Sequence, residues 1–390
     1  MNLHLPAMLR KLPGHHSGSL LVILLVALVL RLAICFFSGL PQITSDSLVY
    51  MRMAYDIIDG TPQSFFPNGF PLLIAGVASF WGGDDIVAPL MLINVILSVC
   101  VVGLAYGIAG PILGRQYALL AAWLTALWPN QLYYVCQVMS EVPAAFFLTA
   151  GLFFLLRRRP LPGGLLLAIA GMLRVSLVPV APVVVLALLF DHTRRRDALL
   201  LMVVVAGCWV GEYALLAAGV VRASSNVDMN LLIAVSDLRT LALDQSLGGF
   251  SDDELVRPLS TYLNFAMAHP AEFCLQRLLA LYDLWGPWPD QGDVNSPRTL
   301  LARLVIGLRF PLLLLALLGL WTRRRDVASW IVASPVLLVT AIHIMFFAGQ
   351  PRFTLPVEPL VMILAAAGIA ELVQRLAGVP DRGQGTSDFG

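Results

Sequence analysis

The chain carries little charge for its length. Of its 390 residues only 13% are charged, whereas 58% are hydrophobic. Soluble domains typically carry about a quarter charged residues, so this chain lacks the polar surface that a soluble body of its size requires. The shortage argues against a soluble enzyme, a nucleic-acid-binding protein and a disordered chain. It predicts an all-α polytopic membrane protein that contacts membrane lipids and no nucleic acid.

Lysine is nearly absent and cysteine is sparse. Lys11 is the single lysine, so arginine supplies the positive charge, much of it in runs at 157–159, 194–196 and 323–325. The five cysteines form no CxxC pair and no cluster with histidine, so neither a zinc site nor an iron–sulfur site is indicated. We therefore predict no metal site and no cofactor.

The chain contains many long apolar stretches. A helix that crosses the hydrocarbon core needs about 20 predominantly apolar residues. Stretches near this length predict about ten transmembrane helices in one domain over 1–390. They lie at 20–37, 86–109, 117–135, 142–156, 162–173, 177–190, 198–218, 303–320, 327–347 and 355–372.

Charge placement fixes the expected topology. The apolar segment 69–81 is too short to cross, and we expect it to be interfacial or re-entrant. With ten crossings, every arginine run lies on the cytoplasmic face, as the positive-inside rule requires; an eleventh crossing at 69–81 would place the runs outside. The topology predicts outer segments at 38–85 and 221–298, a cytoplasmic tail at 376–390 and both termini inside. The second outer segment contains a helical pattern over 252–285.

The first outer segment contains a candidate acidic site. Thr44 or Ser45 can cap a helix that runs to Asp59. Asp46 would then lie in the first turn, with Tyr50 one turn later on the same face. Because acidic residues favour first turns for dipole reasons alone, the spacing leaves a structural and a catalytic role for Asp46 open.

Other ionisable residues border the outer ends of predicted spans. Glu141 opens one span and can be only an N-terminal acid, with Ser140 as its cap. Arg174 and Arg352 border other spans, and both a functional role and extension toward lipid headgroups are open for them. Three further arginines are expected mainly to extend toward the headgroups: Arg31, Arg303 and Arg309.

An ordered set of motifs gives the chain a family resemblance. Its members are Asp46-x-x-x-Tyr50, a Pro/Gly break before 69–81, Ser140-Glu141, Ser224-Ser225-Asn226 and the run from Arg352 to Pro359 before the last span. In this order the set resembles the bacterial relatives of protein O-mannosyltransferases and of the lipid A aminoarabinose transferase, which are integral-membrane glycosyltransferases of the C-type (GT-C) fold.

The resemblance implies transfer of a monosaccharide from a polyprenyl-phosphate donor to an acceptor hydroxyl at the periplasmic face of the bacterial inner membrane. The acceptor can be a glycan, a lipid or a protein. By position in the family motifs, Asp46 matches the catalytic aspartate, and Arg174 and Arg352 match residues that bind the donor phosphate. Four residues are placed at the edge of the substrate site: Glu141, Tyr50, Asn68 and Asn226. The chain departs from the family pattern at Ser47, where many relatives have a second acid, and at Asn68, where most have proline.

Two other functions remain open on the sequence. One is a transporter or flippase for lipid-linked sugars, although we find no inverted repeat of the kind common in secondary transporters. The other is a polysaccharide polymerase or ligase, which would use a diphosphate-linked oligosaccharide donor.

Overall fold

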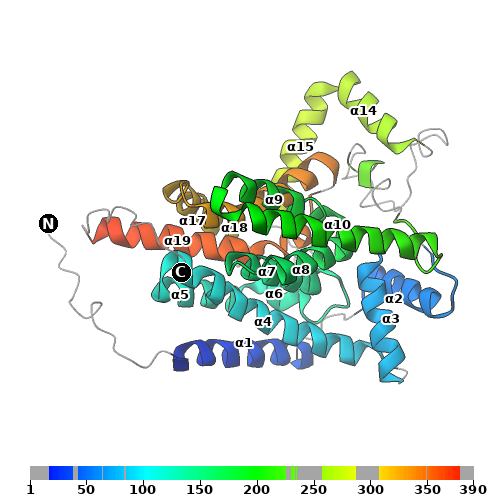
Figure 1. Ribbon diagram of the computed structural model, residues 1–390, viewed down its shortest axis with the longest axis horizontal. Coiled ribbons are helices and arrows are strands. Elements are labelled where there is room, and N and C mark those ends of the chain that lie inside the picture. Colours follow the sequence, from blue (N-terminus) through cyan, green and yellow to red (C-terminus); the bar gives the residue numbers. More distant parts are fainter. Residues whose placement is uncertain are drawn as a thin grey trace, which may run out of the picture.

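The structure, a computed structural model, describes residues 17–37, 43–63, 65–82, 85–224, 230–232, 234, 257–286, 307–347 and 349–377. These residues form α-helices and short 3-10 turns, and no strand occurs among them, which confirms the all-α fold class. Figure 1 shows long helices running side by side in an elongated bundle, with α14 and α15 projecting from its flank.

Five helices in the described ranges are long and apolar enough to cross a membrane. They are α1 (Ser17–Phe37), α4 (Val87–Leu113), α10 (Arg195–Ala217), α18 (Val327–Phe346) and α19 (Glu358–Leu376). The remaining apolar helices are shorter, so the expected count of about ten crossings is not confirmed by helix length. They are α3 (Gly69–Trp81), α7 (Glu141–Leu156), α8 (Pro160–Leu173), α9 (Val180–Phe190) and α17 (Arg309–Thr322).

Proline divides two segments that the sequence predicts to be continuous. The stretch 117–135 becomes α5 (Arg115–Leu127) and α6 (Pro129–Tyr134), separated by the extended residue Trp128. The pattern over 252–285 becomes α14 (Pro258–Ala268) and α15 (Pro270–Trp285). Its first residues, 252–256, lie outside the described residues. Proline lacks a backbone N–H and disfavours a helical conformation in the residue before it. One non-helical residue therefore separates the two helices of each pair.

The short apolar segment 69–81 forms α3 with the predicted bounds. With α2 (Ser45–Ile58) it lies at one end of the bundle and crosses the direction of the long helices (Figure 1). At Gly69 the backbone of α3 closely approaches α8, because a Cβ there would lie 2.5 Å from the carbonyl oxygen of Met172. Gly69 therefore serves helix packing.

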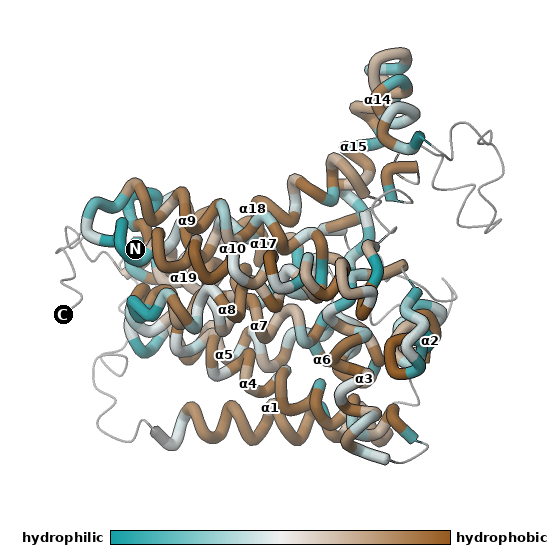
Figure 2. Tube along the Cα trace, turned by 45° about the vertical axis from the view of Figure 1, so that its right-hand side comes forward, coloured by the Kyte–Doolittle hydropathy of each residue, from teal (hydrophilic) through white to brown (hydrophobic). Residues whose placement is uncertain are grey.

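The arginine runs gather at the opposite end of the bundle. Arg157–Arg159 follow the end of α7. The Arg194 guanidinium donates to the carbonyl of Leu155, and Arg323 Nη1 donates to the carbonyl of Ile112 over 2.8 Å. Figure 2 shows hydrophilic residues at the two ends of a hydrophobic bundle. The arginine runs therefore lie at one common end of the bundle, whereas α2 and α3 lie at the other.

Arg31 is buried, contrary to the expectation that it extends toward the headgroups. Its side chain is fully shielded inside the bundle. Its Nε donates to Ser98 Oγ over 2.7 Å, and its Nη1 donates to the carbonyls of Ala27 and Ala126, each over 3.1 Å. Arg31 thus links α1, α4 and α5, because a buried guanidinium needs hydrogen-bond acceptors.

Helix α19 packs closely on α17 through glycine on both sides. A Cβ at Gly319 would collide with the carbonyl of Leu364, and a Cβ at Gly368 would collide with that of Leu315. The two backbones are therefore in direct contact. This contact holds the middle of α19 against α17.

We expect Gly319→Val to lower the free energy of unfolding by about 1–3 kcal/mol, because the added atoms cannot be placed without moving α17 from α19. The melting temperature of the protein in detergent measures the effect. The matched control is Gly211→Val on α10, where a Cβ meets nothing within 4 Å. Equal melting temperatures for the two variants would contradict the prediction.

Candidate active site

A cavity of about 230 Å³ lies where the ends of several helices meet. Its lining comes from α2, from the start of α7, from the end of α8, and from the chain between α18 and α19. The polar and aromatic residues of the lining include Asp46, Tyr50, Phe66, Ser140, Glu141, Arg174, His343, Gln350, Arg352 and Phe353. Five of the residues proposed from the sequence thus share one cavity.

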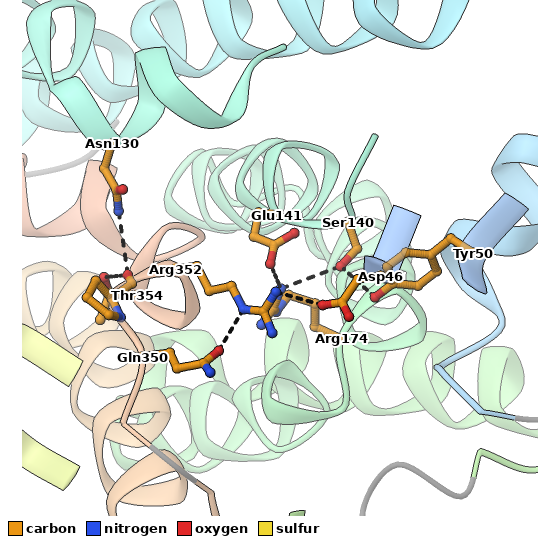
Figure 3. A network of polar contacts seen from close by, with 10 residues as sticks. Asp46, Tyr50, Asn130, Ser140, Glu141, Arg174, Gln350, Arg352 and Thr354 are labelled. Carbon is orange, nitrogen blue, oxygen red and sulfur yellow. Dashed lines mark hydrogen bonds and ion pairs between the residues drawn. The ribbon is translucent and has the colours of Figure 1, made fainter. Parts of the chain in front are cut away.

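Asp46 and Arg352 form an ion pair across this cavity. Arg352 Nη1 lies 2.6 Å from Asp46 Oδ2, and Arg352 Nε donates to Gln350 Oε1 over 2.8 Å (Figure 3). The side chains of Asp46 and Arg352 are 27% and 22% exposed, so a ligand can reach both. The N-cap is Thr44, whose hydroxyl accepts from the backbone N–H of Ser47, and this places Asp46 in the first turn as predicted.

Glu141 and Arg174 form a second and more buried pair. Arg174 Nη1 lies 2.8 Å from Glu141 Oε1 and 3.4 Å from Ser140 Oγ (Figure 3). The other carboxylate oxygen of Glu141, Oε2, is buried and makes no hydrogen bond to the described residues. Ser140 does not cap α7 with its side chain; instead its hydroxyl lies 3.3 Å from the Tyr50 hydroxyl. Ser140 thus occupies the N-cap position of α7 without a side-chain cap.

Two aromatic residues that the sequence reasoning missed complete this site. The guanidinium carbons of Arg174 and Arg352 lie 5.5 and 5.1 Å from the centroid of the Phe353 ring, in cation–π contact. His343, at the end of α18, stacks on the same ring at 4.8 Å. Its Nδ1 lies 2.8 Å from the Val339 carbonyl oxygen, which can only accept, so Nδ1 carries a proton. Phe353 thus holds both arginines beside one cavity.

Tyr50 is held by other aromatic rings. It stacks on Phe66 at 4.3 Å and meets Phe70 edge-on at 5.0 Å. Burial raises the pKa of its phenol, and the carboxylate of Glu141 raises it further. Tyr50 therefore stays a neutral hydrogen-bonding group in the cavity wall.

Two residues predicted at the edge of the substrate site, Asn68 and Asn226, are not among the described residues that line the cavity. Asn68 is buried, and its Nδ2 donates to the carbonyl of Arg222 over 2.8 Å. Ser224 Oγ similarly donates to the Phe65 carbonyl. Asn68 thus joins the first outer segment to the chain that follows α10, and it does not line the cavity. Asn226 lies outside the described residues.

The charges of this site match the helix ends that carry them. Asp46 and Glu141 lie in the first turns of α2 and α7, and Arg174 is the C-cap residue of α8. Helix dipoles favour negative charge at N-termini and positive charge at C-termini. The described residues contain no cluster of three or more His, Cys, Asp or Glu residues that could hold a metal ion.

Comparisons of the sequence with protein families and with curated proteins give no match. Comparison of the fold finds the archaeal oligosaccharyltransferase AglB from Archaeoglobus fulgidus. One structure, with an inhibitory peptide and a dolichol-phosphate, has a TM-score of 0.54 and 14% identity over 94% of this chain and 53% of that chain. The apo form has a TM-score of 0.55 and 17% identity over 92% of this chain and 51% of that chain.

A third structure, tethered to an acceptor peptide, has a TM-score of 0.55 and 14% identity over 92% of this chain and 50% of that chain. The chain has the C-type glycosyltransferase fold. It spans about half the length of these oligosaccharyltransferases. At this level of identity the likeness concerns the fold, and the function has to be argued from the cavity.

The raised pKa of Tyr50 makes stability depend on pH. In the folded protein the phenol stays protonated at pH values at which the same phenol ionises in the unfolded chain. Its contribution to stability is therefore complete below about pH 10 and is lost as the pH rises above that value. We expect Tyr50→Phe to lose less stability than the unaltered protein between about pH 10 and pH 11. Chemical-denaturation midpoints across this range measure the difference, and parallel losses would contradict the assignment.

Proposed function

We propose that the protein transfers a monosaccharide from a polyprenyl-phosphate donor to an acceptor hydroxyl, at the periplasmic face of the bacterial inner membrane. The observation that carries the proposal is the pairing of two carboxylates with two arginines around one cavity of a C-type glycosyltransferase fold. The cavity lies at the end of the bundle away from the arginine runs, which the positive-inside rule assigns to the cytoplasm.

Asp46 supplies the base. The acceptor oxygen attacks the anomeric carbon and forms the new glycosidic bond, while the bond between that carbon and the phosphate oxygen breaks. Asp46 accepts the proton that the acceptor hydroxyl loses, as general-base catalysis requires. The products are the glycosylated acceptor and the polyprenyl phosphate. Asp46 is the more accessible of the two carboxylates, which favours it over Glu141 for this role.

Arg174 and Arg352 stabilise the departing phosphate. Negative charge on that group grows as the bond to the sugar breaks, and donors already in place stabilise it without reorganisation. A guanidinium has five N–H donors and matches the geometry of phosphate oxygens. Arg352 can therefore bind the phosphate while it still contacts Asp46, which would bring the base and the leaving group close to the same anomeric carbon.

The remaining polar groups suit contacts with sugar or acceptor hydroxyls. Glu141 Oε2 is a buried acceptor without a hydrogen bond among the described residues, and a substrate hydroxyl would satisfy it. The neutral Tyr50 hydroxyl can donate or accept. The dolichol-phosphate and the acceptor peptide in two structures of similar fold support a lipid-linked donor and make a protein one of the candidate acceptors.

A second candidate is transfer of an oligosaccharide. The solved structures that share the fold are oligosaccharyltransferases, which favours this alternative over a transporter. Parallel assays with a polyprenyl-phosphate monosaccharide and a diphosphate-linked oligosaccharide separate the two reactions, because each donor gives a product of different mass.

Asp46→Asn is expected to lower kcat for sugar transfer by at least about 100-fold, the lower range for loss of a general base. The assay uses purified protein in detergent with polyprenyl-phosphate sugars and detects the product by mass spectrometry. No membrane compartment is present, so transport alone gives no product. Asp59→Asn is the control, because Asp59 is an exposed carboxylate at the end of the same helix. Near-normal turnover by Asp46→Asn would reject the role of Asp46.

Arg352→Ala is expected to raise the KM for the donor by about 10- to 100-fold, the usual worth of a hydrogen bond to a charged group. The KM for the acceptor should change little, because Arg352 is assigned to the phosphate of the donor. Arg222→Ala removes an exposed arginine next to the first outer segment and serves as the control. An unchanged donor KM for Arg352→Ala would remove this residue from the phosphate site.

A further inference from the structure

A second Arg–Glu pair lies outside the cavity and is more deeply buried than the pairs within it. Arg309 Nη2 lies 2.5 Å from Glu358 Oε1, and the two side chains are only 2% and 1% exposed. Neither residue lines the cavity. A buried ion pair is often no more stabilising than apolar residues of similar size, so stability alone gives little reason for it here.

Glu358 connects this pair to the segment that carries Arg352. Its Oε1 also accepts from Asn130 Nδ2 over 2.8 Å and lies 3.1 Å from Thr354 Oγ1. Figure 3 shows Asn130 extending toward Thr354. Thr354 closes the 3-10 turn η4 (Pro351–Thr354), and its hydroxyl is 2.7 Å from the carbonyl oxygen of Pro351. The single hydroxyl proton of Thr354 is shared between the Pro351 carbonyl and Glu358 Oε1, so this carboxylate oxygen contacts the closing residue of the turn.

The turn η4 is fixed on both sides of Arg352. Asn130 Nδ2 also lies 3.5 Å from the Pro351 carbonyl oxygen, and Gln131 Nε2 donates to the Leu355 carbonyl over 2.9 Å. Only Arg352 and Phe353 of this turn extend to the cavity. Glu358 therefore acts together with Asn130 and Gln131 on the backbone from which the Arg352 side chain reaches Asp46.

Arg309 fixes Glu358 in turn. It is the first residue of α17, its Nη1 donates to the Leu284 carbonyl over 3.4 Å, and its guanidinium lies 5.9 Å from the centroid of the Trp128 ring. The guanidinium thus contacts α15, α19 and Trp128, the residue that precedes α6. A buried arginine in this place also corrects the expectation that Arg309 extends toward lipid headgroups.

We propose that Glu358, held by Arg309, is a positioning residue that fixes η4 and so places Arg352 to bind the phosphate of the donor. This inference rests on the proposed function. It assigns a role in donor affinity to Glu358, a side chain that touches neither the cavity nor Asp46. A misplacement of about 1 Å at a reacting group can cost up to about 100-fold in rate, so a small shift of η4 is enough to matter.

The test compares two double variants. Arg309→Met/Glu358→Leu removes both charges together and leaves no unpaired buried charge, so the protein should fold. Arg309→Met/Glu358→Gln also removes both charges but keeps an oxygen that accepts from Asn130 and Thr354. We expect the Leu variant to bind polyprenyl phosphate about tenfold more weakly, with a matching rise in donor KM and little change in acceptor KM, whereas the Gln variant should stay near the unaltered protein.

Arg194→Met/Asp197→Leu is the matched control, because it removes an Arg–Asp pair of 3.3 Å at the opposite end of the bundle. It should leave the dissociation constant of polyprenyl phosphate unchanged. Unchanged binding by the Leu variant, or equal weakening in the Leu and Gln variants, would overturn the positioning role. A failure of the proposed function is a separate result: the unaltered protein would then transfer no sugar from any polyprenyl-phosphate donor.

Discussion

The ion pair between Asp46 and Arg352 joins residues 306 positions apart in the chain, and the geometry of the cavity depends on it. Asp46 belongs to the short helix α2 at the end of the bundle. Arg352 precedes α19, which is the most deeply buried of the long helices. The pair therefore ties a peripheral helix to the most constrained part of the fold. The Thr44 cap on one side and the Glu358 contacts on the other determine where the two charges meet.

The balance of charge in this site follows from its partial burial. Two carboxylates and two guanidinium groups lie where water has limited access, and unpaired charges in such a place would be unfavourable. Pairing removes that cost and keeps the arginines beside the cavity. Arginine is better suited than lysine, because its planar fork can contact a carboxylate and a second anion at once. The near absence of lysine from the sequence agrees with this demand, although the arginine runs at the other end have a different cause, the orientation of the chain.

The sequence predicts those features that depend on local chemistry. A cap followed by an acid places Asp46 in the first turn of a helix, and a 13-residue apolar segment gives α3 with its bounds. Helix lengths are less predictable. Pro129 and Pro270 divide apolar patterns that a hydropathy profile shows as continuous. Hydropathy alone predicts about ten crossings, whereas five of the described helices are long and apolar enough to cross.

Contacts between helices that are distant in the sequence could not be predicted from the sequence. An arginine in an apolar segment looks the same whether it extends toward headgroups or pairs inside the bundle, and only its partners distinguish the two. Arg31 finds Ser98 and backbone carbonyls, and Arg309 finds Glu358. A polar residue near Arg309 in the sequence would have been a signal, but the partner is 49 residues away. The contact of Phe353 with two arginines was not predictable from the sequence for the same reason.

The cavity is built almost entirely from helix ends, and this explains how an apolar bundle can hold a charged site. Backbone groups at helix termini lack partners within the helix, so these ends need polar neighbours and tolerate charge better than helix interiors. At the cavity, acids stand at the N-termini of α2 and α7, and Arg174 stands at the C-terminus of α8. A bundle that contains short helices has more helix termini near one end than a bundle of long helices only. The breaks that make several helices shorter than a full crossing are therefore the same features that bring charged residues together at one end of the bundle.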